Sequence, residues 1–141
     1  MDASSFTSVR DCLAKDQFAA HCGIELLAIE PGRARARMIL QPHHLNGLGI
    51  VQGGAIFTLA DFAFAAASNS HGTVAVAINV TISFLRSLQT GVLIAEASET
   101  SKNSKLGTYD VRVTSERGEL VATFHGMVYR KTEPTPVKKA L

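Results

Sequence analysis

The longest apolar segment of the chain has the length of a helix and almost no polar face. It starts at Gly53 and reads GGAIFTLADFAFAAASNS. A helix at a protein surface keeps one polar face, whereas a helix that is hydrophobic all round is buried. The segment therefore predicts a long helix with protein on every side, which stops in the polar run of residues 68–72.

The chain before this helix predicts a short helix followed by two strands. In residues 5–22 the apolar positions follow a helical period, and Gly23 is placed to end that helix. Residues 23–40 alternate between apolar and polar on both sides of a turn at Pro31-Gly32. We expect the alternating arginines of the second strand to form a solvated face. They are Arg33, Arg35 and Arg37.

The remaining residues predict one loop, four strands and a tail. Residues 41–52 are rich in turn formers and predict a loop. The tail, residues 132–141, carries two prolines and two lysines, and we expect it to be disordered. Segments rich in β-branched residues or with alternating polarity predict strands, the last two as a hairpin. The strands are expected at residues 73–85, 91–101, 107–114 and 120–130.

A single all-apolar helix among several strands needs a sheet curved around it. The order of elements therefore predicts an α+β protein with a hotdog fold, in which an antiparallel sheet wraps around a long central helix. We expect an N-terminal helical segment over residues 1–22, one hotdog domain over 23–131, and the tail over 132–141.

Composition excludes several classes of protein. The 141 residues leave room for one domain, and a net charge of +2 without a basic stripe argues against nucleic-acid binding. No apolar run is long enough to cross a membrane. The first residues lack the order of a signal peptide, and Cys12 and Cys22 form no disulfide framework. We therefore expect a cytoplasmic protein.

The histidines do not predict a metal site. The five of them lack ligand spacing with Cys or Asp. His43 and His44 are adjacent, so in an extended segment their rings would point to opposite sides. We expect no metal and no redox cofactor.

Asp61 is the only formally charged residue between Leu45 and Leu85. Burying an unpaired carboxylate costs several kcal/mol, and proteins tolerate that cost mainly where the group has a function. The alternative is a structural Asp61 that caps a backbone or pairs with a distant cation such as Arg86. We favour a function, because no Lys or Arg lies near Asp61 in the sequence.

Gly53 and Gly54 open the same helix. The first helical turn has N–H groups without intrahelical partners and favours negative charge, and glycine lets a ligand approach closely. Gly53 and Asp61 are eight residues apart, which is roughly 12 Å along a helix. A reacting carbonyl lies within about 3 Å of the groups that act on it, so one helix cannot supply both. If both act, a two-fold dimer with antiparallel helices must bring Gly53 of one chain to Asp61 of the other.

The loop and helix that read NGLGIVQGGAIFTLAD, residues 46–61, resemble those of the hotdog acyl-CoA thioesterases, most closely the PaaI-like branch named for phenylacetate catabolism. The resemblance covers about residues 20–130. It continues through residues 67–70, 82–86 and 107–111.

The resemblance implies a role for three residues. The helix carboxylate, here Asp61, attacks the thioester or activates water. The Gly53 N–H donates to the thioester oxygen. Asn46 orients the water or the substrate carbonyl; without the resemblance it would be interpreted as a turn residue.

Two positions depart from the family pattern. Relatives usually have His before the two glycines, where this chain has Gln52, which can donate a hydrogen bond but cannot gain a proton. Some relatives hold the attacking water with Ser or Thr at the start of the next strand, where this chain has Ala75, Val76 and Ala77. Both departures predict a lower turnover rate and the same type of reaction.

The resemblance also implies an acyl-CoA site, for an aryl or a medium-chain acyl group. Residues expected at the substrate, several of them in an apolar pocket, are Leu45, Leu48, Gln52, Gly54, Phe57, Thr58 and Phe64. Residues expected at the CoA phosphates are Arg86, Lys102, Asn103, Ser104 and Lys105. A solvated hairpin turn is the open alternative for this second group.

The predicted reaction is hydrolysis of an acyl-CoA thioester by a homodimer, which two dimers could extend to a homotetramer. Asp61 would act as general base or as nucleophile, and CoA is part of the substrate. One alternative is a hotdog hydratase of enoyl or 3-hydroxyacyl thioesters, for which only His43 or His44 could serve as the catalytic histidine. The other is a non-catalytic acyl-CoA-binding protein.

Overall fold

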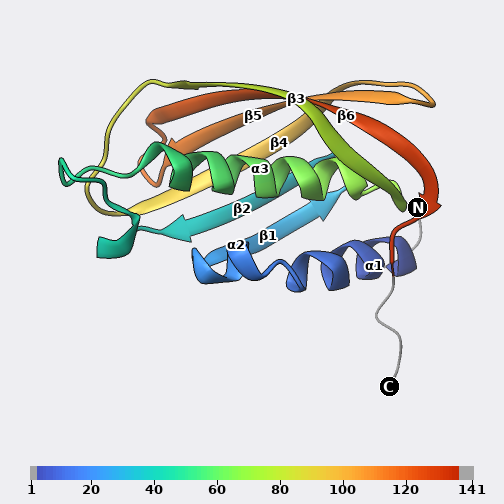
Figure 1. Ribbon diagram of the computed structural model, residues 1–141, viewed down its shortest axis with the longest axis horizontal. Helices are drawn as coiled ribbons and strands as arrows, with labels where there is room; N and C mark the ends of the chain where they lie inside the picture. The colour runs from blue at the N-terminus through green and yellow to red at the C-terminus, as the bar shows by residue number, and fades with distance from the viewer. Residues whose placement is uncertain (1–2, 137–141) are drawn as a thin grey trace.

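The computed structural model describes residues 3–136 of the chain. Three α-helices, one short 3-10 helix and six strands follow one another (Figure 1). In chain order they are α1 (Ala3–Ala14), α2 (Gln17–His21), β1 (Ile24–Glu30), β2 (Arg33–Ile39), η1 (Pro42–His44), α3 (Gly53–Asn69), β3 (Thr73–Phe84), β4 (Val92–Lys102), β5 (Leu106–Ser115) and β6 (Leu120–Pro134).

The six strands form one sheet with the order β1-β2-β4-β5-β6-β3. Each neighbouring pair is antiparallel. The edge strands are β1 and β3, because they stand at the two ends of this order. Figure 1 shows α3 lying across one face of this sheet, with α1 and α2 beside it. The predicted α+β hotdog fold is confirmed. Among residues 3–136, no helix has the length and apolar content needed to cross a membrane.

Helix α3 begins and ends where the sequence predicts. Gln52 is its N-cap, and the Gln52 side chain accepts a hydrogen bond from the Gly54 N–H. At the other end Ser70 is the C-cap, and Gly72 has a φ of 89°, which only glycine adopts without strain. These two ends fix which residues of the segment lie against the sheet.

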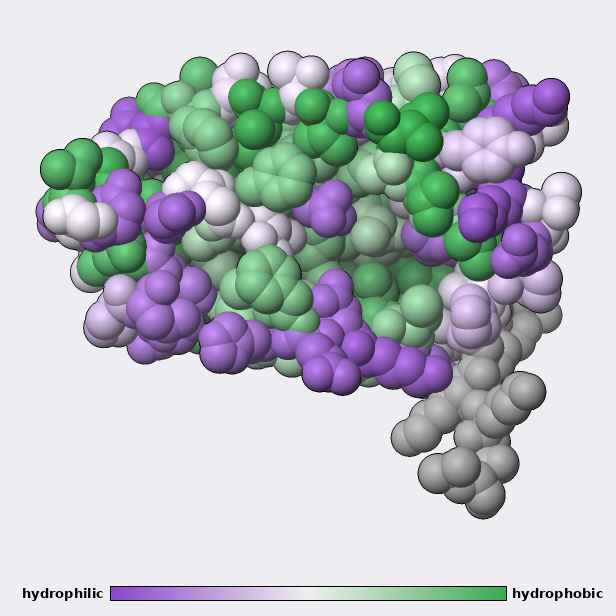
Figure 2. Space-filling model, viewed as in Figure 1, coloured by the Kyte–Doolittle hydropathy of each residue, from purple (hydrophilic) through white to green (hydrophobic). Residues whose placement is uncertain are grey.

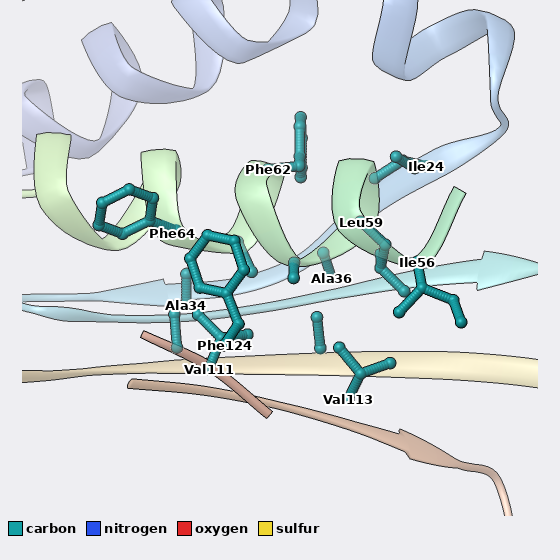
Figure 3. Packing of buried hydrophobic residues seen from close by; sticks show 14 of the residues in the cluster. Ile24, Ala34, Ala36, Ile56, Leu59, Phe62, Phe64, Val111, Val113 and Phe124 are labelled. Carbon is teal, nitrogen blue, oxygen red and sulfur yellow. The ribbon is translucent and has the colours of Figure 1, made fainter. Parts of the chain in front are cut away.

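Small residues let α3 approach the sheet closely. Ala60, Ala63 and Ala66 of the helix are fully buried. Gly126 of β6 accommodates the Phe64 ring, since a Cβ there would lie 2.6 Å from the Phe64 Cζ atom. Figure 3 shows Phe64 beside Phe124, and their ring centroids are 5.4 Å apart. The helix is therefore held at one fixed height above the sheet.

The N-terminal segment differs from the single helix expected over residues 5–22. Asp16 breaks it into α1 and α2, because the Asp16 side chain accepts a hydrogen bond from the Ala19 N–H and so starts a second helix. Val9 of α1 is buried, and Gly23 ends the segment with a φ of 75°. The stop at Gly23 is confirmed.

The expectation of a disordered tail from residue 132 is wrong for its first residues. Strand β6 runs to Pro134, which pairs with Thr73 at the start of β3. The Thr135 N–H then donates to the Gly72 carbonyl, and Thr135 is buried. These backbone partners order the segment. The rest of the predicted tail, residues 137–141, lies outside the described residues.

One face of α3 is open in the single chain. Gly54, Phe57, Thr58, Asp61 and Ala65 all reach solvent, while the residues between them are buried except the partly buried Ala55. They fall at the three- and four-residue spacing of a helical stripe. The single chain therefore does not supply the protein that was expected on every side of α3. Figure 2 shows apolar residues gathered over the middle and upper part of this side, with hydrophilic residues along its lower rim.

Candidate active site

Asp61 lies in the middle of the open stripe of α3 and is partly buried. Within the part of the chain that the structure describes, no hydrogen bond or ion pair joins its carboxylate to another residue. Arg86, the cation considered as a partner, pairs instead with Glu119, with 2.6 Å between Nη1 and Oε2. The alternative in which Asp61 is a structural residue paired with Arg86 is therefore wrong.

The surroundings of Asp61 favour its neutral form. Burial raises the pKa of the Asp61 carboxyl above its usual value, and the negative charge of Asp16 raises it further. Sequence patterns did not reveal Asp16 as a neighbour of Asp61. It precedes Asp61 by 45 residues and approaches it only because α1 and α2 pack beside α3.

Gly53 presents a free N–H at the start of α3. The N–H groups of Ala55 and Ile56 donate to the Gln52 carbonyl, and the Gly54 N–H donates to the Gln52 side chain. The Gly53 N–H has no acceptor among the described residues. It is the donor that remains at the positive end of the helix, where a developing oxyanion would be stabilised.

The Phe84 ring packs against Gly53 and would have to shift slightly to admit a side chain there. A Cβ there would lie 3.1 Å from the Cζ atom of Phe84, which is itself half exposed at the end of β3. Gly53 and Asp61 are separated by two turns of one helix. The structure therefore does not bring the predicted oxyanion donor and the predicted carboxylate together within one chain.

Asn46 organises the loop before α3. Its Oδ1 atom accepts hydrogen bonds from the N–H groups of Leu48 at 2.9 Å and Ile50 at 3.3 Å. The bridge between Leu45 and Val51 closes the base of this loop. The turn role of Asn46 is thus present in the structure, while its Nδ2 group has no partner among residues 3–136 and is free to donate to a ligand.

The two adjacent histidines are not arranged as expected. They form the last residues of η1, and their ring centroids lie 4.2 Å apart instead of on opposite sides. His44 is buried, its Nδ1 accepts from the Gln41 N–H at 2.9 Å, and its Nε2 bonds the Cys22 carbonyl at 2.7 Å. Both ring nitrogens of His44 are therefore used, one within the loop and one in holding the loop to the end of α2.

The residues expected to line an acyl pocket do not share one in the single chain. Phe64 is fully buried and packs against Tyr109 and Phe124, so its expected place at the substrate is wrong. Leu48 is 82% exposed, and Phe57 is 37% exposed on the open stripe. The Thr58 hydroxyl, also on that stripe, donates to the Gly54 carbonyl at 2.7 Å.

The residues expected at the CoA phosphates fall into two groups at opposite ends of the sheet. Arg86 lies near the start of α3, since it follows Phe84, which touches Gly53. The turn 102–105 lies at the other end and is exposed.

Hydrogen bonds order the turn 102–105. The Asn103 side chain accepts from the N–H groups of Lys105 and Leu106. Arg130, which was not predicted, donates from Nη1 to the Asn103 carbonyl at 2.7 Å. The turn is thus a solvated hairpin, which was the alternative interpretation. Lys102 and Lys105 of this turn, together with Arg130 of β6, also form an ordered basic cluster.

Comparisons with known proteins agree with this fold. The family model of the thioesterase superfamily matches residues 48–122, which include Gly53 and Asp61. A putative esterase of Archaeoglobus fulgidus is 38% identical over 130 residues, which are 91% of this chain and 84% of that protein.

The acyl-coenzyme A thioesterase PaaI of Escherichia coli is 37% identical over 116 residues, covering 82% of this chain and 83% of that protein. The solved structure of the E. coli PaaI protein superposes with a TM-score of 0.85 over 92% of this chain and 97% of that one. A Streptococcus mutans protein solved with acetyl-CoA, 24% identical, has the same fold, with a TM-score of 0.75 over 79% of this chain and 90% of that one. The resemblance expected from the sequence is confirmed: the chain belongs to the thioesterase superfamily, with PaaI-like hotdog proteins as its relatives.

Proposed function

We propose that this protein hydrolyses acyl-CoA thioesters at a site that two copies of the chain build together. The observation that carries the proposal is the Asp61 carboxylate. It lies half-buried and without a partner among the described residues, on the one face of the central helix that the chain leaves uncovered. Family membership supplies the reaction class, since the E. coli relative is an acyl-CoA thioesterase.

The open face of the molecule supports a dimer. Strand β3 is a long edge strand, and a long apolar edge is a template for pairing with another chain. Along β3 and just after it, four large apolar side chains are exposed. They are Val76 at 41%, Ile78 at 54%, Phe84 at 52% and Leu85 at 56%. A second copy placed against β3 would bury this edge and the open stripe of α3 together.

Two-fold symmetry then completes the site. Phe57 lies midway between Gly53 and Asp61 in the helix and is exposed. A two-fold axis near Phe57 would run the two α3 helices antiparallel and bring the Gly53 N–H of each chain to the Asp61 of the other. The same operation would bring Arg86 of one chain towards the turn 102–105 of the other, so that both predicted phosphate groups meet at one end of the dimer.

The chemistry follows from these positions. The Gly53 N–H polarises the thioester carbonyl and stabilises the oxyanion. In one route Asp61 takes a proton from water while the water oxygen attacks the carbonyl carbon. In the other Asp61 attacks directly, and water later cleaves the mixed anhydride. In both, the C–S bond breaks, a C–O bond forms, and the CoA thiolate receives the proton, giving a free acid and CoA.

The alternative hydratase has little support from the geometry. It needs a histidine facing the carboxylate, and position 52 is Gln. His44 uses both ring nitrogens elsewhere, which leaves only the exposed His43.

A thiol-release assay on a panel of acyl-CoA thioesters tests the proposal. We expect wild type to release CoA and Asp61→Asn to release almost none. Asp110→Asn is the matched control, because the exposed Asp110 pairs with His125 on the outer surface of the sheet. Tight binding with equal, negligible release by wild type and Asp61→Asn would identify an acyl-CoA-binding protein instead. Loss of enoyl absorbance from crotonyl-CoA without free thiol would identify a hydratase.

A further inference from the structure

An exposed leucine stands at the tip of the turn before α3. Leu48 is 82% exposed, which is more than any other large apolar residue that the structure describes. The turn has a defined shape, because the Asn46 side chain accepts hydrogen bonds from the N–H groups of Leu48 and Ile50. The turn thus presents the Leu48 side chain to water, and a second molecule that covered it would gain apolar burial.

Gly47, beside Leu48, meets no need for glycine within the described chain. Gly49 has a φ of 76°, which favours glycine, but the φ of Gly47 is not positive. A Cβ built on Gly47 would contact nothing within 4 Å. A glycine in open space lets another backbone approach closely. Gly47 and Leu48 together therefore indicate that this turn contacts another molecule.

A cavity of about 340 Å³ lies beside the open stripe of α3. Figure 1 shows the segments that line it, which are α1, the end of α3, the start of β3 and the residues after β6, converging where the chain starts. Its apolar lining includes Val9, Leu13, Ala65, Val74 and Pro136. The turn 102–105 lies at the same end of the sheet, but none of its residues lines the cavity. An occupant of the cavity can therefore leave that turn free for CoA.

The proposed two-fold axis brings the turn and the cavity together. It sets Gly53 of one chain against Asp61 of the other, with the helices antiparallel. The chain that precedes Gly53 then runs beside the partner's α3 in the direction from Asp61 to Asn69. Figure 1 shows this part of the chain projecting beyond the start of α3. Ala65 and Asn69 line the cavity, so the turn of one chain faces the cavity of the other.

We propose that Leu48 of each chain inserts into this cavity of its partner and closes it beside the proposed catalytic carboxylate. The inference rests on the proposed function and names a further residue that the second copy contributes to the site. Ala65 in the cavity wall is one helical turn, roughly 6 Å, from Asp61. Leu48 keeps water from that side of Asp61 and holds Asn46 and Gly53, which flank it in the chain, in place against the partner. Leu48 is thus a positioning residue.

A native cysteine allows the contact to be tested. Cys12 lines the cavity and is exposed, and the other cysteine of the chain, Cys22, does not line it. Leu48→Cys would place a thiol in the partner's cavity, close to Cys12. Mild oxidation or a short bis-maleimide at low protein concentration should then link most chains into covalent dimers, seen on a non-reducing gel.

Two controls locate the link. Adding Cys12→Ser to Leu48→Cys should abolish the covalent dimer, although Cys22 remains. Leu27→Cys should form none, because Leu27 is an exposed leucine on β1, at the opposite edge of the sheet from β3.

Activity shows whether the contact positions the site. Leu48→Ser should lower kcat for acyl-CoA about tenfold, because the turn is no longer fixed against the partner. Leu48→Met should retain the rate, since methionine fills the same space with apolar atoms. Thiol release by the two variants measures both effects.

The two readouts separate this inference from the proposed reaction. An active thioesterase in which Leu48→Cys forms no link to Cys12, or in which Leu48→Ser is as active as wild type, would overturn the inference and leave the reaction intact. Linkage through Cys12 in a protein whose wild type releases no thiol would overturn the reaction and leave the contact intact.

Discussion

Two carboxylates of this protein lie in contrasting surroundings. Glu99 on β4 meets donors on two sides: Tyr109 donates its hydroxyl to Oε2 at 2.7 Å, and His71 Nε2 lies 2.7 Å from the same atom. Asp61 on α3 meets none among the described residues. Burial alone would raise the pKa of both groups, but the hydrogen bonds from Tyr109 and His71 and the nearby positive charges lower the pKa of Glu99 overall.

The difference separates a structural acid from the acid that we propose to be reactive. Glu99 ties the residues after α3 to β5, and its charge is already stabilised. The Asp61 charge is not compensated inside the chain, so it costs stability and remains available to take a proton or to attack a carbonyl. Removing the charge of Glu99 and removing the charge of Asp61 should therefore have opposite consequences.

The largest effect is expected from exchanging each acid for its amide. Asp61→Asn should reduce kcat/KM for acyl-CoA by about a thousandfold. It should leave the melting temperature equal or higher, because it removes a buried charge without a partner. Glu99→Gln should keep activity and lower the melting temperature. Thiol release and thermal unfolding of both variants check this, and a destabilised Asp61→Asn would contradict the comparison.

A smaller effect on stability is expected from Tyr109→Phe. The change removes a buried hydroxyl that bonds Glu99, and should cost about 1–3 kcal/mol of the free energy of unfolding. Because the pKa of Glu99 is lowered in the folded state, its contribution is present above the usual Glu pKa of about 4.3 and is lost as pH falls below it. Urea unfolding at pH 7 and at pH 3 should therefore show a larger difference between wild type and variant at pH 7. Equal differences at both pH values would count against the pairing.

The smallest effect concerns the pH dependence of activity. The Asp61 carboxyl has a raised pKa, and in the proposed mechanism it acts deprotonated. Activity should therefore rise with pH through a midpoint above the usual Asp value of about 3.9. Asp16→Asn keeps an N-cap for α2 but removes the negative charge, and should move the acid limb of kcat/KM to lower pH. An acid limb that does not move would show that burial alone sets the pKa of Asp61.

Much of this molecule could be predicted from local patterns. The apolar run from Gly53, the glycines that end helices and the alternating strands each report their own surroundings, and they sufficed for the hotdog fold. The charge of Asp61 inside an apolar helix also stood out from its neighbours. The split of the first helix at Asp16 depends on a single capping bond, and the strand pairing of residues 132–134 depends on β3, so neither was visible in the periodicity.

Other features depend on long-range contacts. Phe64 reads like any apolar residue of α3, and only the space above Gly126 places it in the core instead of at the substrate. Arg86 pairs with Glu119, and Arg130 reaches the turn at Asn103, through strand neighbours that the sequence does not show. The open stripe of α3 is likewise a property of the folded chain, because an apolar helix looks the same whether its own chain or a second copy covers it.

The most direct test of the composite site mixes two inactive chains. Gly53→Pro removes the proposed oxyanion donor at the first helical position, where proline is tolerated, and Gln52 before it is already extended with a ψ of 134°. Co-expression with Asp61→Asn under two affinity tags, and purification through both, yields dimers in which one site keeps both intact groups. We predict that these dimers hydrolyse acyl-CoA at about half the wild-type rate. Mixed dimers no more active than either variant alone would show that Gly53 and Asp61 do not act across two chains, and would contradict the account.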